Sequence, residues 1–306
     1  MTWYSYALVG PAIWALLNHL DKYVLGRWFN DARTASVLVV FTGFAGFFVA
    51  TFILVFGPSV WMPLWQVGLV VGAGALLVSS YVPYMMAMQG GEPSIVASLY
   101  RLTPLFVFVL SHAVLGESLE PRQIIGGLAT ITGSILLIID VDNKRPFGFD
   151  ICTFALMCAA CLMNACIVVI FKYVALGTSF WGSAFWEYVG AGLFSIALSC
   201  GAPSYRRSLS SLCLSRQAYV LIPVTVSGEL LNLLANLSVS FAGLMAPLSL
   251  VSIVTGMHPL FLLAYGIVLT VLFPAFGNEK LIWHHFLRKT LAIGIMCAGV
   301  VVTFAG

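Results

Sequence analysis

The sequence predicts an all-α integral membrane protein of ten transmembrane helices, arranged as two inverted five-helix repeats. Three observations lead to this fold class. Of the 306 residues, 61% are apolar and 8% are charged, and the mean hydropathy is +1.02, whereas a soluble domain carries about 25% charged residues. The apolar residues form long continuous blocks, and the order of these blocks repeats in the second half of the chain.

Ten blocks are long enough to cross a bilayer as helices, which takes roughly 17–25 residues each. The blocks lie near residues 3–24, 35–57, 64–88, 93–115, 121–140, 150–176, 181–201, 218–241, 246–272 and 284–305. They lack the alternation of polar and apolar residues that strands of a membrane barrel need. Because a helix satisfies its own backbone groups in lipid, we expect ten helices joined by short loops.

Two short motifs of the first half recur in the second. Residues 20–24 resemble residues 170–174, and residues 103–106 resemble residues 258–261, at offsets of about 150 and 155 residues. A unit of five helices has an odd number of crossings, so its second copy must enter the membrane in the opposite sense. This inverted repeat is typical of secondary transporters.

The most polar connection, residues 140–146, divides the chain. We place the first repeat in residues 1–142 and the second in residues 148–306. Pro104 and Pro259 occupy matching places in the two repeats and predict equivalent bends, since proline interrupts helical hydrogen bonding.

Small residues at helical spacing predict close helix contacts in two blocks. Gly68 and Gly72 form one such pair, and Gly126, Thr130 and Ser134 form a longer stripe. Ordinary packing is the alternative interpretation of both patterns.

Lysine and arginine residues lie almost all on one side of the expected bundle. The loops after the odd-numbered helices hold Arg27, Arg33, Lys144, Arg145, Arg206, Arg207, Arg216, Lys280, Arg288 and Lys289. The opposite side holds Arg122 alone. Because cytoplasmic loops carry the excess of positive residues, this bias predicts that both termini lie outside.

Composition and spacing also argue against several classes of protein. The net charge of +3 reflects the loop bias and gives no reason to expect a nucleic-acid partner. The seven cysteines show no CxxC pairing, and His19, His112 and His258 share no metal-ligand spacing. We therefore expect no metal and no cofactor. An enzyme is not expected either, because we find no nucleophile with its base.

The strongest candidate site is a polar stripe in the eighth block. Thr225, Glu229, Asn232, Asn236 and Ser240 are spaced by 4, 3, 4 and 4 residues, so they share one helix face. Glu229 falls near the centre of its block, where ionisable residues are costly and mark transport pathways. Its carboxylate can bind an ammonium group or exchange a proton. The alternative is a neutral glutamic acid that hydrogen-bonds a neighbouring helix for structure.

Other polar residues within the blocks extend this candidate substrate site. Arg101, in the fourth block, can pair with Glu229, bind a substrate carboxylate or form a fixed structural ion pair. Tyr84 can present its ring or hydroxyl to a cavity. Asn18 and Asn164, at matching places in the two repeats, can donate neutral hydrogen bonds to a ligand.

Asp21, Lys22 and Lys172 are candidates for gate or vestibule residues. Lys22 and Lys172 occupy matching places in the two repeats, so inversion would put them on opposite sides of the membrane. The alternative is that each lysine extends from a helix end to the membrane surface.

Several loose motifs in a fixed order carry a family resemblance. They are residues 84–88 with 92–94, 102–106, 115–119, Gln123 and 126–133, then 246–247, 259–261, 278–281 and 294–299. With these motifs the sequence resembles the drug/metabolite transporter superfamily, specifically its EamA-type ten-helix members. The resemblance implies two inverted repeats around a central cavity, no cofactor, and both termini in the cytoplasm, which opposes the charge bias. It also implies structural roles for Glu117 and Glu279.

The leading hypothesis is a secondary active transporter. It moves a small polar, amine-bearing metabolite, such as an amino acid or an amine, by alternating access and with possible proton coupling. The expected partners are this substrate, membrane lipids and protons, and the chain acts as a monomer or a homodimer. We expect a bacterial inner (plasma) membrane location.

Two alternatives remain open on the sequence. A flippase for a lipid-linked or amphipathic substrate would use an apolar cavity wall that opens laterally. A non-transporting membrane scaffold would tolerate substitution of Glu229, Asn232 and Asn236.

Overall fold

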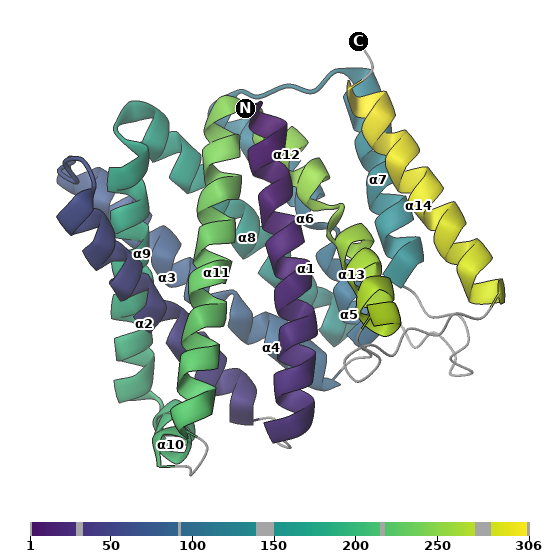
Figure 1. Ribbon diagram of the computed structural model, residues 1–306. Helices are drawn as coiled ribbons and strands as arrows, with labels where there is room; N and C mark the ends of the chain where they lie inside the picture. The colour runs from purple at the N-terminus through teal and green to yellow at the C-terminus, as the bar shows by residue number, and fades with distance from the viewer. Residues whose placement is uncertain are drawn as a thin grey trace.

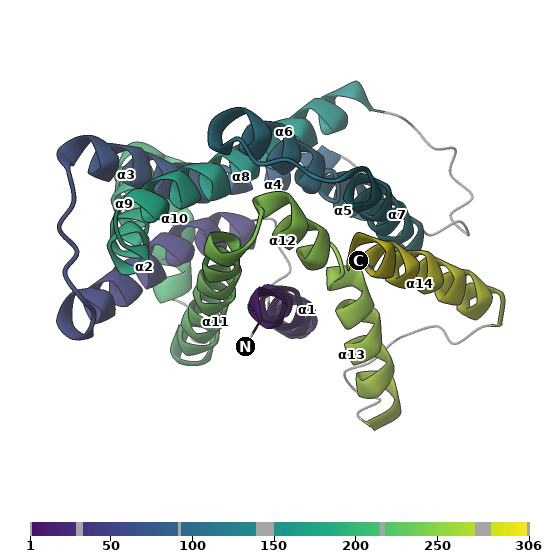
Figure 2. The ribbon, with the colours of Figure 1, turned by 90° about the horizontal axis from the view of Figure 1, so that it is seen from above.

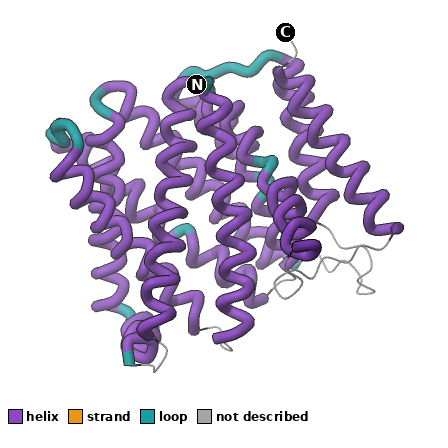
Figure 3. The backbone as a smooth tube through the Cα atoms, in the orientation of Figure 1, coloured by secondary structure: helices purple, strands orange, loops and turns teal. Residues whose placement is uncertain are grey.

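The computed structural model describes most of the chain as helix. The described residues are 2–28, 33–90, 93–138, 150–214, 218–272 and 283–304. Within these ranges no strand occurs (Figure 3). The all-α class predicted from the sequence is thus confirmed, whereas the predicted boundary between the repeats lies outside the described residues.

Seven helices lie in each half of the described chain. The first half holds α1 (Trp3–Trp28), α2 (Arg33–Phe56), α3 (Leu64–Ser79), α4 (Tyr81–Gly90), α5 (Pro93–Tyr100), α6 (Thr103–Leu115) and α7 (Pro121–Ile138). The second half holds α8 (Ile151–Gly177), α9 (Phe180–Gly201), α10 (Pro203–Cys213), α11 (Ala218–Met245), α12 (Leu248–Thr255), α13 (His258–Leu272) and α14 (Trp283–Phe304). Each predicted apolar block is helical over most of its length.

Within the described residues, five helical stretches are long and apolar enough to cross a membrane. They are Leu64–Gln89, Ile95–Leu115, Ile151–Gly177, Ala218–Met245 and Leu248–Leu269. Large apolar side chains are widely exposed on the bundle, which suits lipid rather than water as the surrounding solvent. These observations fit an integral membrane protein.

Two of the apolar stretches are interrupted at equivalent points. α5 ends at Tyr100 and α6 begins at Thr103, just as α12 ends at Thr255 and α13 begins at His258. The second residue of each new helix is proline, Pro104 in α6 and Pro259 in α13. Proline suits the first helical turn because the amide hydrogen that it lacks would have no helical acceptor there. The predicted bends are therefore found as helix breaks.

The helices of the two halves pack against each other in a reciprocal pattern. α1 packs on α11 and on α12–α13, and α8 packs on α3–α4 and on α5–α6 in the same way. α2 pairs with α9, and α7 pairs with α14. Seen from above, α1 lies between α11 and α13 (Figure 2). The start of α1 and the end of α14 lie at one end of the bundle, and α10 lies at the other (Figure 1).

The small-residue stripe of α7 makes a close helix contact, as predicted. A Cβ added at Gly126 would meet the carbonyl oxygen of Gly299 in α14, and Thr130 and Ser134 are fully buried along the same contact. The prediction for Gly68 and Gly72 is wrong, because nothing lies within 4 Å of a Cβ added at either. α3 instead approaches α9 through Gly74, where an added Cβ would overlap the backbone carbonyl of Glu187.

Candidate functional site

Two side chains of α1, about one helical turn apart, contact the neighbouring helices α11 and α13. Trp14 Nε1 donates a hydrogen bond to Asn232 Oδ1 of α11 at 3.0 Å. The Nδ2 of Asn18 lies 3.2 Å from Nε2 of His258, the first residue of α13. Since four residues rise about 6 Å along a helix, α1 carries two polar contacts about 6 Å apart along its axis.

Asn232 joins the predicted carboxylate to two other helices. Its Nδ2 lies 3.3 Å from Glu229 Oε2 and 3.5 Å from the hydroxyl of Tyr81, the first residue of α4. Its Oδ1 accepts the bond from Trp14 described above. Glu229 and Asn232 are both half-buried. At Asn232, the predicted stripe of α11 thus faces α1 and the start of α4.

Asn236 lies one turn further along the same helix and is also half-buried. Its side chain makes no hydrogen bond to any residue that the structure describes. Asn236 lies on the same helix face as Glu229.

Arg101 occupies the break between α5 and α6. Its Nη2 lies 3.0 Å from Nδ1 of His258. An arginine can only donate, so Nδ1 accepts, and the neutral ring carries its proton on Nε2. For a hydrogen bond to form between Nε2 and Asn18, the amide must turn its Oδ1 to the ring, because both nitrogens would otherwise be donors. Arg101, His258 and Asn18 then form one directed chain of hydrogen bonds.

Two tyrosines stand beside Arg101. The rings of Tyr84 and Tyr100 pack edge to face with their centroids 5.7 Å apart. Tyr100 directly precedes Arg101 in the chain. Tyr84, a predicted site residue, is therefore part of the same cluster.

The remaining predicted residues make other contacts. Asn164 Nδ2 donates to the carbonyl of Ala160 in its own helix at 3.2 Å, and it makes no hydrogen bond to the cluster around α1. The side chains of Asp21 and Lys22 lie outside the described residues.

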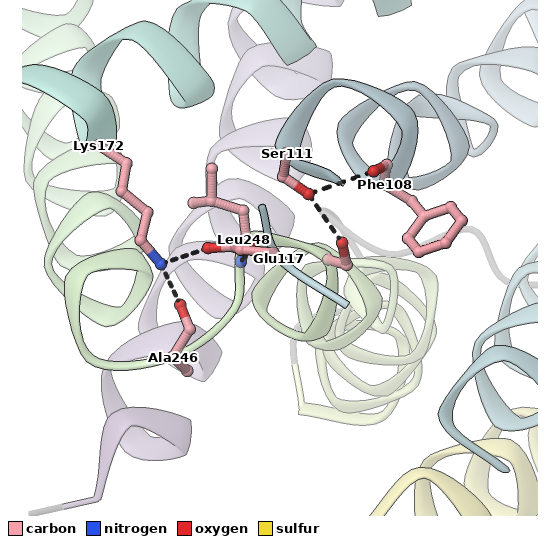
Figure 4. A network of polar contacts seen from close by, with 7 residues as sticks. Phe108, Ser111, Glu117, Lys172, Ala246 and Leu248 are labelled. Carbon is pink, nitrogen blue, oxygen red and sulfur yellow. Dashed lines mark hydrogen bonds and ion pairs between the residues drawn. The ribbon is translucent and has the colours of Figure 1, made fainter. Parts of the chain in front are cut away.

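Lys172 is buried in a second polar network (Figure 4). Its Nζ lies 2.6 Å from Glu117 Oε1 and 2.7 Å from the carbonyl oxygen of Ala246. The other carboxylate oxygen, Oε2, accepts the backbone N–H of Leu248 at 2.8 Å. We call these four residues the Glu117–Lys172 clamp. It fixes the loop after α6 to α8 and to the link between α11 and α12.

The sequence missed two residues of the cluster around α1. Trp14 reads as one more apolar residue of its block, and His258 reads as a packing residue. His258 stands directly before Pro259, at a predicted bend, and a polar residue at such a bend is the signal that could have found it. No comparable signal marks Trp14.

A small apolar pocket lies between α6, α7 and α12, lined by residues such as Phe108, Ile131 and Ile253. Its volume of about 50 Å³ is small, and it contains none of the predicted site residues. Sites for metabolites usually measure roughly 300–1,000 Å³. We therefore locate the candidate site at the polar cluster around α1, where charged and amide groups from several helices meet.

Comparison with known proteins agrees with this architecture. The family model described as the EamA-like transporter family matches residues 1–139. The curated proteins give no match. A solved structure titled only as the crystal structure of a protein is similar over 98% of this chain and 96% of its own, with a TM-score of 0.68 at 19% identity. At this identity the similarity demonstrates the fold alone.

Proposed function

We propose that the protein is a secondary active transporter of the drug/metabolite transporter type, because the model of the EamA-like transporter family matches residues 1–139. Its substrate is a small polar metabolite that carries an amine, and transport proceeds by alternating access. The observation that carries this proposal is that Asn232 of α11, which bonds to Glu229 in its own helix, also bonds to Trp14 of α1 and Tyr81 of α4. This arrangement places a carboxylate beside the amide of Asn232.

The proposed architecture has ten transmembrane helices in two inverted repeats, residues 1–142 and 148–306. In this scheme the pairs α3–α4, α5–α6 and α12–α13 each count as one crossing. The short helix α10 lies along the membrane surface. The reciprocal packing of α1 and α8 supports this proposal, because each contacts the third and fourth crossings of the opposite half. Such exchange is expected when two like units are related by a pseudo-two-fold axis in the membrane plane.

Within this scheme Glu229 holds the ammonium group of the substrate. Asn232 orients the carboxylate, and Asn236 donates to or accepts from polar groups of the substrate. Trp14 and Tyr81 belong to the first repeat and Glu229 to the second. A rocking motion between the repeats therefore changes access to the substrate from either face. Proton coupling would require Glu229 to take up a proton on one face and release it on the other.

Lys172 acts at a gate in this proposal, as part of a closed end of the bundle. The Glu117–Lys172 clamp joins the loop after α6 to the second repeat, so opening that end requires the clamp to separate. Asp21 and Lys22 lie toward the other end of α1 and are proposed for the opposite gate.

For orientation we propose that the end with α10 faces the cytoplasm. Arg206 and Arg207 of α10 are exposed there, and the positive-inside rule favours that side. Both termini are then outside. Labelling of single cysteines from either side of intact cells tests this orientation.

The substrate test uses purified wild type and Glu229→Gln, with Glu187→Gln as the matched control. Glu187 is also a helical glutamate, but it is buried within α9, with 7% exposure, and is not part of the stripe of α11. A ligand that binds the native state raises the melting temperature by mass action. We expect an amine-bearing ligand to stabilise wild type and Glu187→Gln but not Glu229→Gln.

The ligand found in this way is then followed in proteoliposomes by counterflow. A ligand that shifts all three proteins equally would remove the assignment of Glu229. Absence of any shift, together with absence of counterflow, would favour the scaffold hypothesis.

A further inference from the structure

The short helix α10 lies across the end of the bundle rather than along it. In Figure 1 it is seen nearly end-on, whereas long helices such as α11 are seen from the side. It packs on α2 and α9. In a protein that spans a bilayer, a helix in this position lies at the level of the lipid headgroups.

α10 has an inner face that fixes it to the bundle. Tyr205 and Leu209, about one helical turn apart, are both half-buried. Tyr205 packs against a cluster built around Val78 of α3 and Ala191 of α9. The position of α10 is therefore set by its apolar side chains, which leaves its opposite side to face the surroundings.

The outer face of α10 is basic. Arg206, Arg207 and Ser210 are exposed, and their spacing puts them on the side of the helix away from Tyr205. α10 contains no acidic residue. Neither arginine makes a salt bridge to any residue that the structure describes. This face therefore complements an anionic partner.

Exposed apolar side chains next to the arginines indicate the kind of partner. Leu214 follows Arg207 by seven residues, which is about two helical turns along the same face, and it is 85% exposed. Tyr219, in the first turn of α11, is 80% exposed. Leucine and tyrosine are favoured where lipid headgroups meet acyl chains, whereas a soluble acidic protein offers them no such layer.

We propose that the outer face of α10 binds anionic phospholipids of the membrane. Arg206 and Arg207 contact the phosphate groups, and Leu214 and Tyr219 reach the boundary between headgroups and acyl chains. The orientation proposed above puts α10 at the cytoplasmic leaflet, which carries the anionic lipids. This binding does not depend on which substrate the protein carries.

The inner face of α10 connects this lipid surface to the candidate site. Tyr81 packs against the same cluster as Tyr205, and its hydroxyl lies 3.5 Å from Nδ2 of Asn232. A lipid that holds α10 in place therefore also supports the start of α4, where Asn232 bonds.

The test measures lipid preference on the purified full-length protein. The protein is placed in nanodiscs with equal amounts of phosphatidylglycerol and phosphatidylcholine of the same acyl chains, and native mass spectrometry counts the lipids that stay bound. Each arginine near an anionic surface contributes roughly a factor of 5 in affinity, so we expect wild type to prefer phosphatidylglycerol about 10-fold or more.

Four variants assign this preference to α10. Arg206→Gln with Arg207→Gln should lose it, and Arg206→Lys with Arg207→Lys should keep most of it because both charges remain. Leu214→Ser should lower the binding of both lipids and leave the preference unchanged. Arg122→Gln is the matched control and should behave like wild type, since Glu120 already offsets the charge of Arg122 at 2.6 Å.

The opposite results are equally clear. Equal binding of the two lipids by wild type would overturn the proposal without any variant. A preference that the double glutamine variant keeps would put the lipid site elsewhere and overturn it as well. Poly-glutamate and glycerol phosphate are soluble competitors: displacement of phosphatidylglycerol by either, at equal concentration of negative charge, would assign the arginines to an acidic protein or a soluble phosphate instead. None of these results alters the amine-binding test of Glu229→Gln.

Discussion

The Nζ of Lys172 lies 2.6 Å from Oε1 of Glu117, although the two residues are 55 positions apart in the sequence. The lysine side chain is 9% exposed and the glutamate side chain 12%. The same Nζ donates to the carbonyl oxygen of Ala246, and Oε2 of Glu117 accepts a hydrogen bond from the backbone N–H of Leu248, so the pair bonds to the backbone on either side of Pro247. The pair therefore determines how the link between α11 and α12 sits against the loop after α6.

Removing one charge of this pair should destabilise the protein strongly. For Lys172→Met and for Glu117→Gln we expect a loss of about 3–5 kcal/mol, because the partner charge stays buried without compensation. The double variant should lose less than the sum of the two. The free energy of unfolding in mixed micelles measures these effects.

The exposed pair of Arg122 and Glu120 is the control for that prediction. Their side chains are 43% and 59% exposed, so Arg122→Gln should cost about 0–1 kcal/mol. Similar losses in the buried and the exposed pair would contradict the role given to burial.

The contact of α7 with α14 predicts a second pair of contrasting variants. A Cβ at Gly299 would lie 2.6 Å from the carbonyl oxygen of Gly126, so Gly299→Ala must push the helices apart. We expect a loss of roughly 1–3 kcal/mol. Gly294→Ala in the same helix meets open space and should be neutral or slightly stabilising. Equal melting temperatures for the two variants would show that the helices do not meet as described.

Asp150 gives a prediction on pH. The hydroxyl of Thr153, then the backbone N–H groups of Thr153 and Cys152, donate to its carboxylate and hold its pKa below the ordinary value. A carboxyl with a lowered folded-state pKa stabilises the fold above its unfolded pKa and loses this effect as the pH falls through the folded value.

We therefore expect the melting temperatures of wild type and Asp150→Ala to differ at neutral pH and to converge as the pH falls below about 4. Asp150→Asn keeps an acceptor that does not titrate, so its difference from Asp150→Ala should not depend on pH. A constant gap between wild type and Asp150→Ala down to the lowest pH would exclude this cap as a titrating group.

The hydrogen bond between Trp14 and Asn232 predicts an energetic coupling between α1 and α11. A double-mutant cycle of Trp14→Phe and Asn232→Leu should give about 0.6–1.7 kcal/mol, the range of such bonds between membrane helices. The cycle of Trp14→Phe with Asn236→Leu should be additive, since Asn236 makes no hydrogen bond to a described residue. Coupling in the second cycle only would indicate that α11 is rotated.

Much of the fold could be predicted because its signals are local. The apolar blocks predicted most helix ends to within a few residues, and Pro104 and Pro259 predicted two equivalent breaks, whereas α10 and the break between α3 and α4 were not predicted. The stripe of α11 gave Glu229 and Asn232 as neighbours, because a helix brings residues three apart onto one face.

Other features could not be predicted because they depend on which helices meet. The glycine pair at Gly68 and Gly72 looks like the stripe of α7 in sequence, yet only the latter faces another helix closely. Lys172 reads as a helix-end lysine, and only the approach of Glu117 buries it. Trp14 carries no local sign of its partner, which lies 218 residues away.

The sequence by itself determined that this is a helical membrane protein and where its ten long apolar segments lie. That information is local, because lipid requires each segment to satisfy its backbone groups internally over a fixed length. Only the tertiary structure decided that α1 bonds to His258 through Asn18 and to Asn232 through Trp14, and that Arg101 meets His258. Hydrogen bonds need an approach of about 3 Å, and helix packing alone brings such distant residues that close.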